Sequence, residues 1–240
     1  MRPGQVATGA GEGAATMPLS GEMSAKAPHW GGSRTDAVKR CLDVGLALVA
    51  LALCAPLMLL AGVMVRLSGP GPVLLQQVRI GRNEQPFVML KFRTMHVDAD
   101  DRIMREMNAR ELRGECAPDC ADGVYKPKND PRVTPAGRWL RRYSIDELPQ
   151  LFNVLRGEMS LVGPRPSLPW EVELYTPEQR RRHGCLPGMT GLWQVSGRTR
   201  LSMIEMLELD LMYIRTRSLA LDLRILAHTP AAVLLDRTVR

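Results

Sequence analysis

The chain has 240 residues, enough for one domain of moderate size with tails, and 45% of them are hydrophobic, which allows a packed core. Its net charge of +7 indicates an acidic partner, and nucleic acid, anionic lipid and phosphorylated small molecules all meet that condition. Five irregularly spaced cysteines argue against a disulfide framework and for free thiols.

The first 35 residues are rich in Gly, Ala, Ser and Pro and show no hydrophobic periodicity. This composition is typical of a segment that cannot bury enough apolar surface to fold. No basic stretch followed by an apolar run occurs here, so the pattern does not indicate a signal peptide. We predict that residues 1–35 form a disordered N-terminal tail.

Residues 36–67 are predicted to be a membrane segment, because no charged residue occurs from Val44 to Val65. About 20 helical residues cover roughly 30 Å, the thickness of one hydrocarbon core. However, Pro56 follows Ala55 in mid-segment, where proline bends or breaks a helix, and basic residues flank both ends. The positive-inside rule prefers both flanks on the cytoplasmic side. We therefore expect a re-entrant helix bent at this pair, rather than a straight span with a proline kink or a buried soluble helix.

The remaining residues, 68–240, are expected to form one domain. Two β-prone runs at 73–80 and 87–92 surround a Gly-Arg-Asn turn and predict a small hairpin. Residues 98–113 have the pattern of a charged amphipathic helix, and the Gly, Pro and Asp-Pro signals of residues 114–133 indicate a loop.

Two helices are predicted next. Thr134 and Pro135 are typical of a helix start, with Thr as the N-cap and Pro at the first position. The second helix is expected to begin at Ser144 or Asp146 and to stop at Gly157. Its apolar stripe consists of Leu148, Leu151, Phe152 and Leu155.

From Leu201 to Leu235, Leu, Ile and Met alternate with charged residues, with interruptions near Arg217 and at Pro230. The charges argue against a second transmembrane helix. A globular helix pair and helices lying on the bilayer surface both remain open.

The adjacent carboxylates Asp146 and Glu147 are the first candidates for chemistry. A purely structural explanation exists, because the segment from Ser144 to Glu147 fits a capping box and acidic side chains suit a helix start. Three other segments favour phosphate, since glycine turns admit phosphate to backbone amides and arginine binds it with two N–H groups. They are Lys91-Phe92-Arg93-Thr94-Met95, Gly163-Pro164-Arg165-Pro166 and the glycine-punctuated stretch from Pro187 to Arg198.

These segments occur in one order with Lys39-Arg40-x-x-Asp43 and Ser144-Ile145-Asp146-Glu147-Leu148-Pro149-Gln150. Together, from about residue 36 to 230, they closely resemble the bacterial sugar transferase family, the monotopic polyprenyl-phosphate hexose-1-phosphate transferases. The resemblance is to the small form, without the large N-terminal membrane domain of some relatives, and to enzymes that begin exopolysaccharide or O-antigen repeat units.

The resemblance implies a mainly α fold with a small β-hairpin (α+β). It implies a monotopic protein of the bacterial inner (cytoplasmic) membrane, with a Pro-broken re-entrant helix and amphipathic interfacial helices. Residues 68–240 would be the catalytic domain, with its active site on the cytoplasmic face. The family usually has Ser before the membrane proline, whereas Ala55 precedes Pro56 here, so the bend depends more on Pro56 alone.

Residue roles follow from the same resemblance. Asp146 matches the nucleophile and is the expected ligand of a required Mg2+ ion, and Glu147 matches the assisting carboxylate. The residues expected around the phosphates and the nucleotide are Lys91, Arg93, Arg141, Arg165, Gln194 and Arg198.

The implied reaction transfers hexose-1-phosphate from a UDP-hexose to polyprenyl (undecaprenyl) phosphate, releasing UMP, through a phosphoryl-aspartate. Attack by a carboxylate on a diphosphate costs on the order of 4 kcal/mol per pair of unit charges about 4 Å apart at an effective dielectric near 20. Magnesium and arginine can offset this repulsion, and an acceptor lipid at the membrane explains the apolar segment.

Two other classes of protein are alternatives to this enzyme. One is a catalytically inactive, membrane-tethered scaffold of polysaccharide assembly. The other is a nucleic-acid-binding domain, which we do not expect because no reading motif is present and residues 44–65 would stay unexplained. The sequence does not identify the hexose (galactose, glucose or an N-acetylated sugar). It also leaves open whether the protein forms a homodimer.

Overall fold

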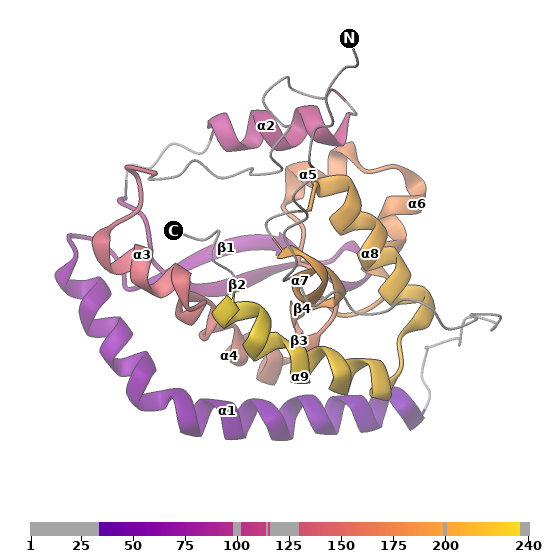
Figure 1. Ribbon diagram of the computed structural model, residues 1–240, viewed down its shortest axis with the longest axis horizontal. Coiled ribbons are helices and arrows are strands. Elements are labelled where there is room, and N and C mark those ends of the chain that lie inside the picture. Colours follow the sequence, from indigo (N-terminus) through magenta and orange to yellow (C-terminus); the bar gives the residue numbers. More distant parts are fainter. Residues whose placement is uncertain (1–33, 98–101, 114, 116–129, 199–200, 236–240) are drawn as a thin grey trace, which may run out of the picture.

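The computed structural model describes residues 34–97, 102–113, 115, 130–198 and 201–235, and it is mainly helical with two small two-stranded sheets (Figure 1). The expected mainly α fold with a small hairpin is confirmed. Of the predicted tail, only Arg34 and Thr35 lie within the described residues, and both are helical. Most of the loop predicted at 114–133 also lies outside them.

The first helix, α1 (Arg34–Leu67), is the one helix in the described part of the chain that is long and apolar enough to cross a membrane. Only 11% of its most apolar stretch is buried in the protein. Large apolar side chains cover its outer face, and Leu53 and Leu59 are 75% and 74% exposed. Such a surface is unusual for a soluble protein and typical of a lipid contact.

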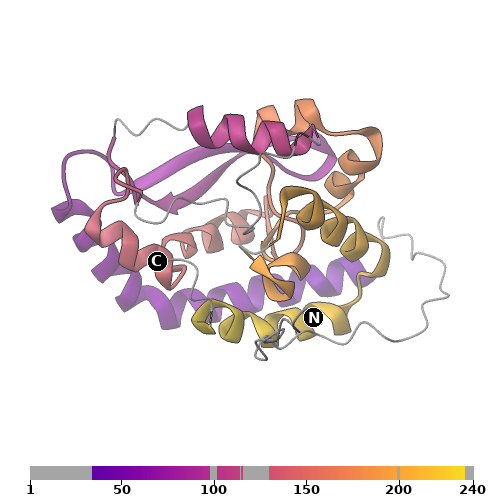
Figure 2. The ribbon, with the colours of Figure 1, turned by 45° about the horizontal axis from the view of Figure 1, so that its top comes forward.

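Helix α1 is continuous through Pro56, but it does not run straight. Figures 1 and 2 show it following a curved path around the edge of the domain. Before Pro56, Ala47 packs into the main core. After it, Ala61 and Val65 pack into a second cluster with Phe92. Proline removes one helical hydrogen bond, which lets the two halves lie against different parts of the domain.

The N-terminal half of α1 is attached to the domain by the Lys39-Arg40-x-x-Asp43 motif. Lys39 Nζ lies 2.7 Å from Asp222 Oδ2, and Arg40 donates to the carbonyl of Leu155. Asp43 accepts a hydrogen bond of 2.8 Å from Ser160. The motif therefore docks the helix on its own domain.

The C-terminal end of α1 is attached to the same domain by Arg93. This buried guanidinium donates to the carbonyls of Val65, Gly69 and Pro70, at and just beyond the end of the helix. Orphan carbonyls at a helix end favour such a cation. Both ends of α1 are thus held by one globular unit.

The predicted hairpin is confirmed as strands β1 (Leu74–Ile80) and β2 (Pro86–Phe92), which pair antiparallel around the 3₁₀ turn η1 (Arg82–Glu84). Helix α2 (Arg102–Leu112) covers the edge of the domain far from α1 (Figures 1 and 2). Helix α3 (Pro135–Arg142) begins as predicted, because Thr134 Oγ1 accepts a hydrogen bond of 2.9 Å from the Gly137 amide.

The second predicted helix is placed wrongly. Residues Ile145–Glu147 form a 3₁₀ turn, η3, and helix α4 (Gln150–Arg156) begins only after Pro149. Ser144 makes no side-chain capping bond, so the capping-box explanation of the acidic pair fails. The helix does stop at Gly157, whose φ of 83° suits a C-cap. Within α4, Leu151 of the predicted apolar stripe is buried, whereas Phe152 is exposed.

The sequence did not indicate a second strand pair. Strand β3 (Ser160–Val162) lies parallel to β4 (Gly188–Thr190), next to helix α7 (Leu192–Ser196). The pairing sets the Gly-Pro-Arg-Pro turn beside the glycine-punctuated stretch, as in the hydrogen bond from Gly163 N to Thr190 O.

Short helical segments complete the middle of the domain: α5 (Pro169–Leu174), α6 (Pro177–Arg180) and the 3₁₀ turn η4 (Arg181–Gly184). The C-terminal region is a helix pair, α8 (Met203–Thr216) and α9 (Leu219–Leu235), broken near Arg217 as predicted. The interruption predicted at Pro230 is wrong, because α9 continues through it. Packing of Ile225 in the main core holds the helix despite the missing hydrogen bond.

Candidate active site

The acidic pair lies next to two cations, Lys91 and Arg141. Asp146 is buried, and its Oδ2 lies 2.7 Å from Lys91 Nζ. Glu147 is half-exposed, and its Oε1 lies 3.9 Å from the same ammonium group. Asn153 of α4 bonds the backbone of β2 at Leu90, next to Lys91, and so fixes the hairpin against the turn that carries Asp146.

The backbone beside Asp146 is strained. Ser144 and Arg198 both have positive φ, 52° and 51°, and the Arg198 guanidinium donates a hydrogen bond of 3.2 Å to Ser144 Oγ. Non-glycine residues in this region cost on the order of 1 kcal/mol each and gather at functional sites. Arg198 also donates to the carbonyl of Ala232, so it joins the site to α9.

Arg141 borders the acidic pair from α3. Its Nε donates a hydrogen bond of 2.8 Å to Thr94 Oγ1. Burial lowers the pKa of Arg141, and the nearby Asp146 carboxylate opposes that shift. A partly desolvated guanidinium near the Asp146 carboxylate is suited to bind the anionic groups of a substrate.

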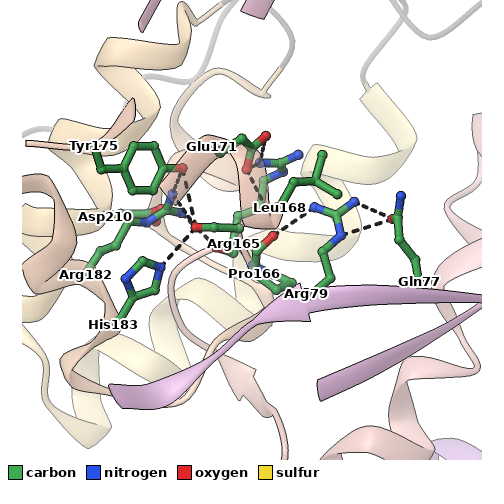
Figure 3. A network of polar contacts seen from close by, with 11 residues as sticks. Gln77, Arg79, Arg165, Pro166, Leu168, Glu171, Tyr175, Arg182, His183 and Asp210 are labelled. Carbon is green, nitrogen blue, oxygen red and sulfur yellow. Dashed lines mark hydrogen bonds and ion pairs between the residues drawn. The ribbon is translucent and has the colours of Figure 1, made fainter. Parts of the chain in front are cut away.

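Arg165 belongs to a polar network with Glu171 and Arg182 (Figure 3). Its NH1 lies 3.2 Å from Glu171 Oε1, and Arg182 donates to its carbonyl. Burial alone would raise the pKa of Glu171, but Arg165 and the Leu168 amide outweigh it and lower that pKa. The loop is therefore rigid, while the Arg165 side chain keeps a partly exposed edge.

Arg182 anchors this network to α8 through an ion pair with the buried Asp210. It also donates to Tyr175 Oη at 2.8 Å. Burial, followed by Arg182, lowers the pKa of His183 to about 4, so the imidazole is neutral at pH 7. Sequence reasoning missed these residues, because an ionic network assembled from α5, η4 and α8 has no local spacing signal.

For two of the predicted binding residues, the structure gives no contact, within the ranges it describes, with the acidic pair or with Arg165. The Arg93 guanidinium is used at the end of α1, as described above. Gln194 lies on α7, and its buried Oε1 has no hydrogen-bond partner in the described part of the chain. Binding of substrate by either residue stays a prediction.

Close backbone packing of Gly188 against Gly163 fixes the loop of Arg165, so a larger residue at position 188 is expected to destabilise the protein. A Cβ on Gly188 would collide with the backbone of Gly163, whereas Gly184 has open space around it. Gly188→Ala is expected to destabilise the protein by more than about 3 kcal/mol, since backbone atoms cannot move aside as side chains do. Thermal unfolding of the detergent-solubilised protein measures this. Gly184→Ala is the matched control, and equal stability of the two variants would contradict the packing.

The residues suit a magnesium ion of the kind that binds with few protein ligands. Among the described residues, no three His, Cys, Asp or Glu side chains gather. Mg2+ is usually held by one or two carboxylates together with substrate phosphates and water. Asp146 and the half-exposed Glu147 fit that donor set.

A buried carboxylate among cations, next to an apolar surface helix, defines an enzyme site for an anionic substrate in a membrane-associated protein. The model of the bacterial sugar transferase family matches residues 34–236. The exopolysaccharide production protein ExoY of Rhizobium meliloti is 42% identical over 228 residues, which is 91% of this chain and 98% of that protein. The chain therefore belongs to the bacterial sugar transferase family, and the expectation that it is an enzyme, a phosphoglycosyl transferase, is confirmed.

Two further relatives carry names that state a reaction. The UDP-glucose:undecaprenyl-phosphate glucose-1-phosphate transferase of Caulobacter vibrioides is 42% identical over 207 residues, 83% of this chain and 70% of that protein. The undecaprenyl-phosphate galactose phosphotransferase of Salmonella typhimurium is 39% identical over 199 residues, 82% of this chain but 40% of that protein.

Proposed function

We propose that this protein transfers hexose-1-phosphate from a UDP-hexose to undecaprenyl phosphate and releases UMP, as the first membrane step of exopolysaccharide or O-antigen synthesis. The observation that carries the proposal is the pair of Asp146 and Lys91, 2.7 Å apart, beside the membrane helix. Ile145, the neighbour of Asp146, packs in the same cluster as Ala61 and Val65 of α1. A carboxylate so placed meets a soluble nucleotide sugar and a lipid phosphate at one depth.

The proposed chemistry has two steps. In the first, an Asp146 carboxylate oxygen forms a bond to the β-phosphorus of the UDP-hexose. The bond from that phosphorus to the bridging oxygen breaks, and UMP leaves with the oxygen. In the second, an oxygen of undecaprenyl phosphate attacks the hexose-phosphoryl aspartate, and the Asp146 carboxylate is released. The product is the undecaprenyl diphosphate hexose.

The surrounding cations would stabilise the negative charge on the carboxylate and on the phosphoryl group in both steps. Lys91 can pass from the Asp146 carboxylate to the transferred phosphoryl group, because its ammonium group already lies between Asp146 and Glu147. Arg141 and Arg165 are expected to bind phosphate oxygens. A magnesium ion held by Asp146 and Glu147 would supply further charge to offset the repulsion between carboxylate and diphosphate.

We also propose that α1 is re-entrant and that the active site faces the cytoplasm. The uncharged stretch from Val44 to Val65 covers about one hydrocarbon core, so its length does not decide between a span and a re-entrant helix. The attachments do favour one of them, because the Lys39 end and the Val65 end both bind one domain. A span would carry its second half across the bilayer, away from that domain. Helix α9 lies beside α1 (Figures 1 and 2). It exposes Leu223 and Leu234, which favours a position at the same membrane interface.

The topology gives a prediction for labelling. In a variant without the five native cysteines, single cysteines are placed by Ser33→Cys, before α1, and Gln85→Cys, on the exposed hairpin turn. A membrane-impermeant maleimide is expected to label both in inverted membrane vesicles and neither in spheroplasts. Labelling of Ser33→Cys in spheroplasts, with Gln85→Cys protected, would mean that α1 spans the bilayer.

The reaction is tested by UMP release from a panel of UDP-sugars with undecaprenyl phosphate in detergent or nanodiscs. UMP release with one or more sugars, dependent on the lipid, is expected. The panel also identifies the hexose. A folded protein without turnover for any sugar would favour the inactive scaffold.

A further inference from the structure

We infer that Arg79 is a further substrate-binding residue, which contacts the diphosphate of the nucleotide sugar together with Arg141 and Arg165. The inference rests on the proposed function. On sequence alone, Arg79 is only one of the basic residues after the membrane segment. The structure instead places it on β1, with its side chain directed at the loop of Arg165 (Figure 3).

Strand register puts Arg79 on the same face of the hairpin as Lys91. Arg79 is opposite Phe87 in the antiparallel pair, and Leu75 is opposite Lys91. Directly opposed residues share a face, and so do residues two or four apart on a strand. The two cations are four residues apart in register, or roughly 13 Å along the strands, a separation that two long side chains can reduce.

The positive charge of Arg79 is available to a ligand, in contrast to the charges of Arg165 and Lys91. Arg165 is paired with Glu171, and Lys91 with Asp146. Among the residues that the structure describes, Arg79 has no carboxylate partner and donates only to Gln77 Oε1 and the carbonyl of Pro166. These bonds use three of the five N–H groups of a guanidinium. Two remain for a ligand.

The surroundings of Arg79 favour an anion. Burial, followed by the neighbouring Arg165, lowers the pKa of Arg79 to about 9, which leaves it charged at neutral pH. Glu171 and Glu147 oppose the shift but do not cancel it. A partly buried cation without an ion pair is costly, and a bound diphosphate would relieve that cost.

The test compares binding and turnover in Arg79→Gln, Arg79→Lys and a control. The control is Arg82→Gln, an exposed arginine of the same hairpin outside the site. Arg79→Gln is expected to raise the Kd for UDP and the KM for the UDP-sugar about 10- to 100-fold, as for a lost hydrogen bond to a charged group. The KM for undecaprenyl phosphate is expected to stay unchanged. If the Gln variant does not fold, Arg79→Lys keeps the charge and tests whether two N–H groups of a guanidinium are needed.

A role limited to holding Pro166 would give a different result. Arg79 would then act only through Arg165, and Arg79→Gln would have no further effect on UDP binding in an Arg165→Ala background. For direct contact, the two losses are expected to multiply. Unchanged UDP affinity in Arg79→Gln and Arg79→Lys would overturn the inference, as would loss of the effect in the double variant.

Failure of the inference can be told apart from failure of the proposed function. If the unmodified protein turns over a UDP-sugar and the Arg79 variants bind UDP as well as it does, only the inference fails. If the unmodified protein binds UDP in an Arg79-dependent way without turnover, only the proposed function fails. If it binds no UDP, both fail.

Discussion

Asp146→Asn is expected to abolish turnover, by at least about 1,000-fold, and to abolish exchange of labelled UMP into UDP-sugar as well. An amide has the shape of the carboxylate but is a poor nucleophile and a poor magnesium ligand. Lys91 loses an ion pair of 2.7 Å, but it can still donate to the amide oxygen and keeps Glu147 nearby, so folding should survive. Glu173→Gln, an exposed acid outside the site, is the matched control for charge removal.

UMP exchange separates two mechanisms that give the same product. With a phosphoryl-aspartate, UMP exchanges into the UDP-sugar without any lipid acceptor, and the kinetics are ping-pong. A direct transfer, in which Asp146 only holds magnesium, forbids that exchange. Sequential kinetics without exchange, in enzyme shown to be active, would contradict the covalent route and leave the overall reaction intact. Glu147→Gln is expected to slow the reaction without eliminating it.

Arg141→Ala is expected to reduce kcat/KM about 100-fold or more, as when an aligned donor to a transition state is removed. Arg141→Lys is expected to recover little of it, because an ammonium group replaces neither the fork nor the bond from Nε to Thr94. The measurement is steady-state UMP release at varied UDP-sugar.

The neighbouring Arg142 supplies the control for Arg141. It is exposed on the same helix, with its guanidinium 5.7 Å from the centre of the Tyr143 ring. Arg142→Ala should leave turnover within about twofold, as for a surface substitution. Equal turnover in the Arg141→Ala and Arg142→Ala variants would show that Arg141 is a surface charge without a role in the reaction.

Local signals in the sequence predicted the elements with strong chemical punctuation. Thr134 with Pro135, and Gly157, mark helix ends that the structure reproduces. The 3₁₀ turn of Asp146 was not predicted, because Ser144 has the residue type of an N-cap. Its left-handed conformation, which prevents the capping bond, cannot be recognised from the sequence. A strand pair of three residues each, separated by more than twenty residues, has too little periodicity to detect.

The candidate site was predictable as a set of residues but not as an arrangement. The resemblance named Asp146 and Lys91, and the structure brings them into contact. It named Arg93 as well, which the fold uses at the end of α1. Arg79 was missed because its position depends on strand register and on the distant loop of Pro166, neither of which a short motif encodes.

The way α1 is attached has a consequence for the order in which the protein is made. Its acceptors come late in the chain: Arg40 is separated from Val154 by 114 positions, and Lys39 from Asp222 by 183. The N-terminus leaves the ribosome first, so the apolar helix is complete long before its docking partners have been translated. Under the proposed topology, we expect the bilayer to hold the newly made helix until the growing domain closes onto it. Asp222 on α9 is translated later than Val154, so the attachment of Lys39 is expected to form after that of Arg40.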